Sequence, residues 1–385
     1  MSTPLIHYTP ILSIAPSYAI EFFKIDSDIN YQKPSNRFNL LTVSNSDTFS
    51  KNSQKKLKNY IDWFVEQSLN KVVISKKNNI RKFYKLNMIT LTLPFEQHHS
   101  DQIIKQQLLN QFFIEAKKKW NMFNYIWRAE KQHNGNIHFH IVSDVFIPWQ
   151  ECRNIWNRIC DKLDLVKLYT AKMKERFEFG FNITPEELKK YSVSVLKKRF
   201  RAGKKTGWTD PNSIDIHALY KINNISAYLT EYLVKKENED LQEFVPAKNA
   251  PSEIIERLEK QKQEYLSKMQ VAGRNWYVSD NIRNYCKNIQ IKIIPIIQKL
   301  CNDTFINTEN LLYANNFVTV IKKGINYFRA NSNYIKNKID SHIKNMRIKL
   351  HHGSSYDCLQ KIKKYKPKFI KPEIIKLQPC QINLY

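Results

Sequence analysis

The sequence predicts an α+β protein: an antiparallel sheet with packed helices, followed by a basic, mainly helical C-terminal region. Three observations predict this class. Apolar and polar residues alternate through residues 88–94 and on both sides of the turn signal at residues 134–135, as in strands with one buried face. Apolar residues recur at helical spacing through residues 103–120. Beyond about residue 240 the pattern is charged and helical.

The chain before the first of these strands is expected to contain one helix. Residues 1–50 are expected to be loosely structured, since they hold three prolines and a polar run that ends in a candidate helix cap. Apolar residues then recur at helical spacing through residues 55–69, which predicts a helix there. The basic stretch 76–87 leads into the strand at 88–94.

The two strands around residues 134–135 form a predicted hairpin whose register decides which side chains share a face. A two-residue turn would pair Glu130 with Phe139, whereas a three-residue loop with Gly135 in the left-handed region pairs Glu130 with His138. We expect the second register, because one face is then entirely apolar. That face carries Tyr125, Trp127, Ala129, Ile137, Phe139 and Ile141, and the other carries Arg128, Glu130, His138 and His140.

Further elements are expected after the hairpin. A helix is predicted over residues 148–163, and the basic, glycine-containing stretch 197–213 is expected to be a surface loop. A short strand over residues 213–219 and a helix over 223–236 follow, with two asparagines as cap candidates at the start of the helix.

Charge is the strongest signal in the composition. The 385 residues include 62 Lys and Arg against 35 Asp and Glu, a formal net charge of +27, which predicts a polyanionic partner such as nucleic acid. No apolar stretch has the length of a membrane span, the N-terminus shows no secretory pattern, and the six cysteines form no C-x-x-C pair. We therefore expect a cytoplasmic protein with no membrane partner.

Two histidines on the polar face of the hairpin are candidate metal ligands. Residues i and i+2 of a strand face the same side, so His138 and His140 can bind one ion, with Glu130 as a third ligand from across the hairpin. Two imidazoles and a carboxylate leave open positions on a divalent ion, Mn²⁺ or Mg²⁺, and the histidines favour Mn²⁺. The alternative is that the histidines only occupy a polar face.

The helix at 223–236 carries candidate nucleophiles. Tyr228, Tyr232 and Lys235 lie together on one flank of its apolar stripe. A tyrosine oxygen can attack phosphorus to form a covalent phosphotyrosine, and a nearby ammonium can offset the developing charge. The alternative is that both tyrosines are amphipathic residues at the edge of the core.

The ordered set of MITLTLP, a glutamate eight residues before His-Phe-His, and YLTEYLVK resembles the HUH endonuclease family. These proteins are rolling-circle replication initiators (Rep) of single-stranded DNA phages, small DNA viruses and plasmids. The resemblance covers roughly residues 81–240 and is closest to the two-tyrosine phage form. One departure is Glu231, where such proteins often carry a lysine. GRNWYVS at 273–279 also resembles a segment that follows the nuclease domain in phage members.

The resemblance implies a domain organisation and a set of site residues. An HUH nuclease domain with an antiparallel sheet would span residues 81–240, between an N-terminal extension with a helix (1–80) and a basic, mostly helical C-terminal region (241–385). The implied metal ligands are Glu130, His138 and His140, and the implied catalytic residues are Tyr232, Tyr228 and Lys235.

The resemblance also implies a reaction. The protein would nick one strand of origin DNA, keep the 5′ phosphate on tyrosine, leave a 3′-OH for a borrowed polymerase and later rejoin the strand. Its implied partners are single-stranded origin DNA and the host DNA polymerase and helicase, in the host-cell cytoplasm if a phage encodes it. The alternatives are a relaxase or single-strand transposase with the same site, or a non-catalytic basic DNA-binding or packaging protein.

The C-terminal region is expected to add DNA affinity rather than chemistry. Residues 322–349 hold eight Lys or Arg, one acidic residue and no catalytic set. Deleting residues beyond about 285 is therefore expected to weaken DNA binding and to spare cleavage of a short oligonucleotide.

Overall fold

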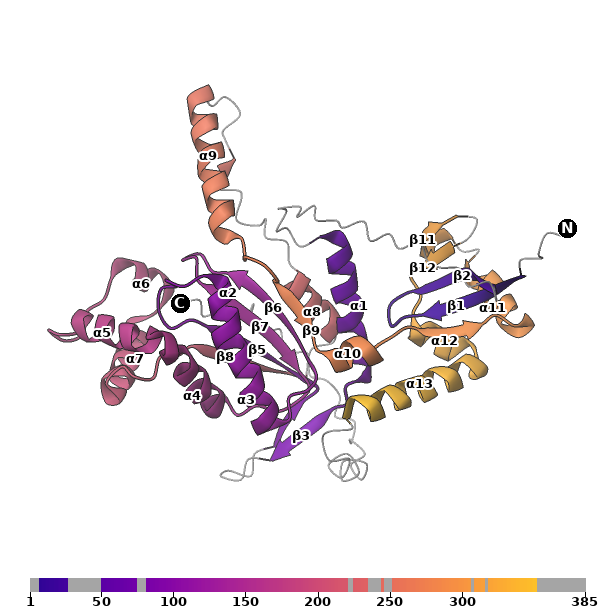
Figure 1. Ribbon diagram of the computed structural model, residues 1–385, viewed down its shortest axis with the longest axis horizontal. Coiled ribbons are helices and arrows are strands. Elements are labelled where there is room, and N and C mark those ends of the chain that lie inside the picture. The colour runs from indigo at the N-terminus through magenta and orange to yellow at the C-terminus, as the bar shows by residue number, and fades with distance from the viewer. Residues whose placement is uncertain are drawn as a thin grey trace.

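The computed structural model describes residues 7–26, 50–74, 81–220, 224–234, 244–245, 251–305, 308–315 and 318–351. These residues form two five-stranded sheets and a two-stranded ribbon, with helices between and around them (Figure 1). Every strand pairing among them is antiparallel. This mixed arrangement is consistent with the predicted α+β class. No helix of the described residues is long and apolar enough to cross a bilayer.

The first sheet contains the predicted hairpin and has the strand order β8-β5-β7-β6-β9. Its strands confirm the four that the sequence predicted and add a fifth, which comes from the GRNWYVS segment and pairs with β6. The strands are β5 (Leu86–Thr92), β6 (Tyr125–Lys131), β7 (Ile137–Ser143), β8 (Ile214–Leu219) and β9 (Trp276–Val278).

The β6–β7 hairpin has the expected register. Glu130 pairs with His138, and the backbone N–H of Gln132 donates to the carbonyl of Asn136 at 2.8 Å, which closes a three-residue loop. Gly135 has φ +80°, in the left-handed region that favours glycine. The loop therefore fixes the pairing along both strands.

One face of this sheet is covered by helices that the sequence predicted. A continuous helical stretch consists of α2 (Asp101–Ile103), a π-helical segment (Ile104–Leu109) and α3 (Asn110–Trp120), and α4 (Trp149–Cys160) lies beside it. Aromatic side chains fill the interface: the Trp156 ring lies 6.0 Å from the Phe112 ring and 6.4 Å from the Phe139 ring, both nearly perpendicular. The predicted apolar face of the hairpin is thus buried against these helices.

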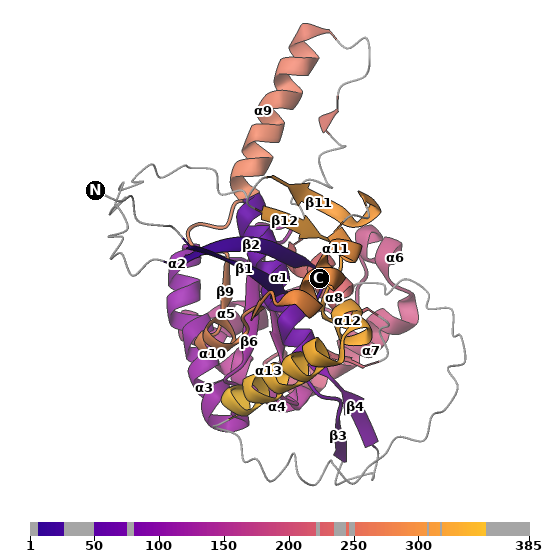
Figure 2. The same cartoon turned by 90° about the vertical axis from the view of Figure 1, so that its right-hand side faces the viewer.

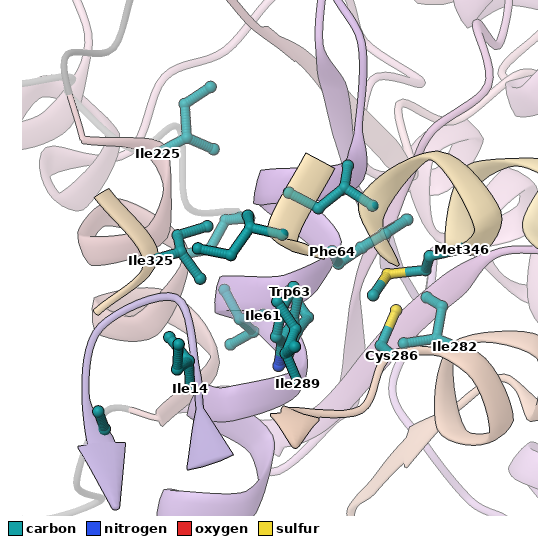
Figure 3. Packing of buried hydrophobic residues seen from close by; sticks show 14 of the residues in the cluster. Ile14, Ile61, Trp63, Phe64, Ile225, Ile282, Cys286, Ile289, Ile325 and Met346 are labelled. Atoms are coloured by element: carbon teal, nitrogen blue, oxygen red, sulfur yellow. The ribbon is translucent and has the colours of Figure 1, made fainter. Parts of the chain in front are cut away.

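The opposite face packs against α1 (Lys51–Gln67) and α8 (Ile225–Val234). The Ser50 hydroxyl caps α1 by accepting the Ser53 N–H at 3.2 Å, as the sequence predicted. A second apolar cluster joins this face to the other sheet. Figure 3 shows the residues of α1, among them Trp63 and Phe64, packed with Ile289 and with Met346. The two sheets therefore share one core.

The second sheet has the order β10-β1-β2-β12-β11 and corrects one expectation. Residues 7–26 are not loosely structured but form two paired strands. Ile14 pairs with Ile289, at the other end of the chain, so the pattern around residue 14 could not reveal its partner. The strands are β1 (His7–Ile14), β2 (Ala19–Asp26), β10 (Ile289–Lys292), β11 (Leu311–Ala314) and β12 (Val318–Ile321).

The stretch 197–213 corrects a second expectation, because its first ten residues belong to a helix. This helix, α7 (Val193–Thr206), ends at Gly207 in the left-handed conformation. Gly203 was a loop signal in the sequence, but a Cβ there would lie 1.8 Å from the Trp208 ring, so the glycine makes room for that side chain. With α5 (Leu165–Arg176) and α6 (Pro185–Lys190), α7 forms a helical lobe at one end of the molecule (Figure 1).

The C-terminal region is largely helical, as expected, but also supplies strands. It contains α9 (Ser252–Met269), which projects from the body in Figures 1 and 2, and α10 (Asp280–Tyr285). Three further helices are α11 (Pro295–Phe305), α12 (Ile325–Asn331) and α13 (Asn333–His351). The ribbon is formed by β3 (Lys71–Ile74) and β4 (Arg81–Tyr84). The boundaries at 80 and 240 stay a prediction, although strands from both outer segments share one sheet.

The structure changes the result expected from deleting residues beyond about 285. β10 pairs with β1, and α13 buries Ile339, Ile343 and Met346 in the core between the sheets. Because the truncation opens this core, we expect loss of the cooperative thermal transition rather than weaker DNA binding alone. Circular dichroism on heating measures this. A chain ending at residue 351 is the control, and a normal transition in the shorter chain would contradict the packing.

Candidate active site

Three side chains converge on the exposed end of the sheet face that carries α8. Glu130 Oε1 lies 2.8 Å from His138 Nε2 and 2.7 Å from His140 Nε2. The three ligand atoms lie within 4.8 Å of one another, close enough to share one ion after a small adjustment. The convergence expected from the hairpin register is confirmed.

Neighbouring groups favour imidazole states that can bind a metal. Thr90 Oγ1 of β5 lies 3.1 Å from His140 Nδ1. When Nδ1–H donates to Thr90, the His140 Nε2 lone pair is free for an ion, a second-shell arrangement typical of metal-binding histidines. Both histidine side chains are buried, whereas that of Glu130 is 30% exposed, so the triad is open to solvent on the carboxylate side.

The charge states of the triad also suit a divalent cation. Burial raises the pKa of Glu130, but the hydrogen bonds to His138 and His140 outweigh it and hold the pKa well below its usual range. Burial lowers the pKa of His138, against the opposing effect of Glu130. A carboxylate and a neutral imidazole are the forms that bind metal, so the residues present fit the ion that the sequence predicted.

The tyrosine helix lies beside this triad. Asn224 caps α8 by accepting the Ala227 N–H at 3.0 Å, as expected for one of the two cap candidates. The ring centroid of Tyr232 lies 6.4 Å from that of His140, and the Tyr228 ring lies 4.7 Å from the Tyr232 ring. Tyr232 is thus the tyrosine in contact with the triad, and Tyr228 packs against it. Lys235 and Asn223 lie outside the described residues.

Arg128 connects α8 to the sheet. The sequence placed this residue on the polar face without a role. Its side chain is 1% exposed, and Nη1 donates to the carbonyl of Leu233 at 2.8 Å, near the C-terminal end of α8, where a cation is favoured. Arg128 pairs with His140 in the hairpin, so the anchor of the helix stands next to the triad. The alternation of the strand was the signal for this position.

A second polar pair lies farther along the same face. Asp215 of β8 pairs with Thr90, which pairs with His140, so the three side chains point to one side of the sheet. His217 Nε2 lies 2.6 Å from Asp215 Oδ2, and this hydrogen bond raises the pKa of His217. Sequence reasoning assigned no role to the pair, although the alternation of SIDIHAL places both residues on one face.

Comparison with known proteins agrees with the resemblance noted in the sequence. Residues 87–237 match the model of a family described as Replication-associated protein, of the ORF2 type. The match supports a replication-associated, Rep-type protein. It runs from β5 to the end of α8, so it includes the triad and both tyrosines, and it suggests DNA interaction and a role in replication initiation. Comparisons with curated proteins and with solved structures give no match.

Binding of Mn²⁺ by the triad should weaken as the pH falls from 7.5 to 5.5. Protons compete with the ion for the imidazoles, which titrate near pH 6.5 in ordinary surroundings. Because the pKa of His138 is lowered, this ligand stays neutral to a lower pH than a free imidazole, so most of the loss is expected below about pH 6. Isothermal titration calorimetry measures the affinity. Equal affinity at both pH values, or in a Glu130→Gln variant, would contradict the site.

Proposed function

We propose that this protein is a replication-initiation endonuclease that nicks and rejoins single-stranded DNA at an origin, and so starts rolling-circle replication. The observation that carries the proposal is the 6.4 Å separation between the rings of Tyr232 and His140. It brings a nucleophile next to three metal-competent side chains from elements far apart in the sequence. The family match supports the replication role. We further propose that the β8-β5-β7-β6-β9 sheet is an HUH nuclease core.

The triad has the role of metal site in this proposal. Glu130, His138 and His140 would hold one divalent ion, Mn²⁺ or Mg²⁺. When bound, such an ion polarises a phosphodiester oxygen. Thr90 would keep His140 in the tautomer that the site requires, through the contact at Nδ1.

The covalent chemistry would belong to α8. The Tyr232 oxygen attacks phosphorus, a bond forms between Tyr232 Oη and phosphorus, and the bond from phosphorus to the 3′ oxygen breaks. The electron pair leaves with the 3′ oxygen, which takes up a proton, and the 5′ phosphate stays on tyrosine. Attack by a 3′-OH reverses the step and rejoins the strand. Lys235 would offset charge on the phenolate, by analogy with the family.

The two tyrosines should differ in their effect on cleavage. Tyr232 contacts the triad and Tyr228 packs behind it, so Tyr232→Phe should abolish the covalent adduct with a labelled oligonucleotide. Tyr228→Phe should spare the first cleavage and impair a second transfer. Denaturing electrophoresis of the labelled adduct separates these results, with Tyr285→Phe as the control. An adduct that survives the double substitution of both α8 tyrosines would rule out this helix.

The histidines should affect nicking and DNA binding differently. His138→Ala and His140→Ala should each lower Mn²⁺-dependent nicking at least about 100-fold, because each removes a ligand. DNA binding should stay close to that of the unmodified chain, since it rests on the Lys and Arg excess. Nicking assays and fluorescence anisotropy on the same preparations give both values. Parallel loss of both would favour a structural role for the histidines in a non-catalytic DNA-binding protein.

The enzyme alternatives separate by substrate. A replication initiator should prefer a single-stranded oligonucleotide from the origin of its own DNA circle. A preference for a transfer origin or for a transposon end would favour a relaxase or a single-strand transposase with the same site. In the proposed reaction the free 3′-OH is extended by the host DNA polymerase, with the host helicase opening the duplex.

A further inference from the structure

Helix α7 carries a strip of cations along one side. The helix contains six Lys or Arg and no acidic residue. Five of them are exposed, and at 100° per residue they fall within about 120° of the helix surface. The ion pairs recorded for the described residues of this lobe use Lys167, Lys172 and Arg176. The members of the cation strip are Lys197, Lys198, Arg201, Lys204 and Lys205.

An exposed phenylalanine stands beside this strip. The side chain of Phe179 is 98% exposed, although it lies between two aromatic residues that are packed. The rings of Phe177 and Phe181 lie 5.0 Å and 5.3 Å from the ring of Phe200 in α7. The turn is therefore held against the helix while Phe179 points into solvent, which is costly for a large apolar side chain without a ligand.

The position of Phe200 places the exposed ring next to the cations. Lys197 precedes Phe200 by three residues and Lys204 follows it by four, so both are its neighbours on the helix surface. The turn that carries Phe179 packs on Phe200, which lies at the edge of the cation strip. Positive charge and a free aromatic face thus occupy one surface of the lobe.

We propose that the cation strip and Phe179 form a binding surface for single-stranded DNA, separate from the metal triad. Backbone phosphates would contact the cations, and a base would stack on Phe179, the combination that sequence-independent single-strand binding uses. A membrane surface fits less well, because Leu196 and Phe200 of α7 turn toward the lobe rather than outward with the cations. The proposal does not rest on the proposed function, since it concerns binding without cleavage.

Substitution of Phe179 tests the stacking contact. Fluorescence anisotropy of a labelled oligothymidylate with the full chain in EDTA reports binding alone. Phe179→Ala and Phe179→Leu should each weaken binding about tenfold, whereas Phe179→Trp, which keeps an aromatic face, should bind within about twofold of the unmodified chain. Because the side chain is exposed, thermal unfolding should be unchanged in all three variants.

Neutralisation of the strip tests the phosphate contacts. A triple variant with Lys197→Ala, Arg201→Ala and Lys204→Ala should lower the slope of log affinity against log salt by about 2, since each single-strand phosphate contact contributes about 0.7. The control is a triple variant of α9 with Arg257→Ala, Lys260→Ala and Lys268→Ala. It removes one arginine and two lysines, all exposed, from a helix that also carries acidic residues, and it should leave the slope nearly unchanged.

Three results would overturn the proposal. The first is unchanged oligonucleotide binding in the Phe179 variants and in the α7 triple variant. The second is an equal loss of salt dependence in the α9 control, which would reduce the strip to bulk charge. The third is Phe179-dependent sedimentation with phosphatidylserine vesicles together with Phe179-independent DNA binding, which would make the surface a membrane contact.

Discussion

The register of the β6–β7 hairpin is the constraint on which the rest of the site depends. A slip of one residue would pair Glu130 with Phe139 and separate the carboxylate from the two histidines, because alternate side chains of a strand face opposite sides. Gly135 holds the register through its positive φ. The same pairing sends Trp127 and Phe139 into the core, where their rings lie 6.2 Å apart. Core packing and site geometry therefore support one another.

The position of α8 adds the second half of the site. Leu229 and Leu233 are buried in the core that the two sheets share, and Arg128 holds the Leu233 carbonyl from the sheet side. The helix is thus fixed from two directions with Tyr232 toward His140. Much of that core comes from the second sheet and from α13, so the C-terminal region supports the tyrosine helix through packing. This dependence explains why the region cannot be treated as an appended basic tail.

The sequence could predict those features whose contacts are local. The pairing of Glu130 with His138 followed from strand alternation and one glycine, and the adjacency of the two tyrosines followed from helical spacing. β1 and β2 could not be predicted, because their outer partners come from the other end of the chain. α7 was missed because Gly203 resembled a loop residue, whereas its role is to accommodate Trp208. The approach of α8 to the histidines depends on tertiary packing, which periodicity does not report.

Anomalous diffraction at the manganese edge, from crystals of the full chain soaked in Mn²⁺, would test the central claim most directly. We predict a strong anomalous peak bonded to Glu130 Oε1 and to the Nε2 atoms of His138 and His140, with the hydrogen bonds between carboxylate and imidazoles replaced by metal bonds. A peak held by other residues, or a triad that keeps its hydrogen bonds in saturating Mn²⁺, would contradict the assignment of these side chains as the metal site.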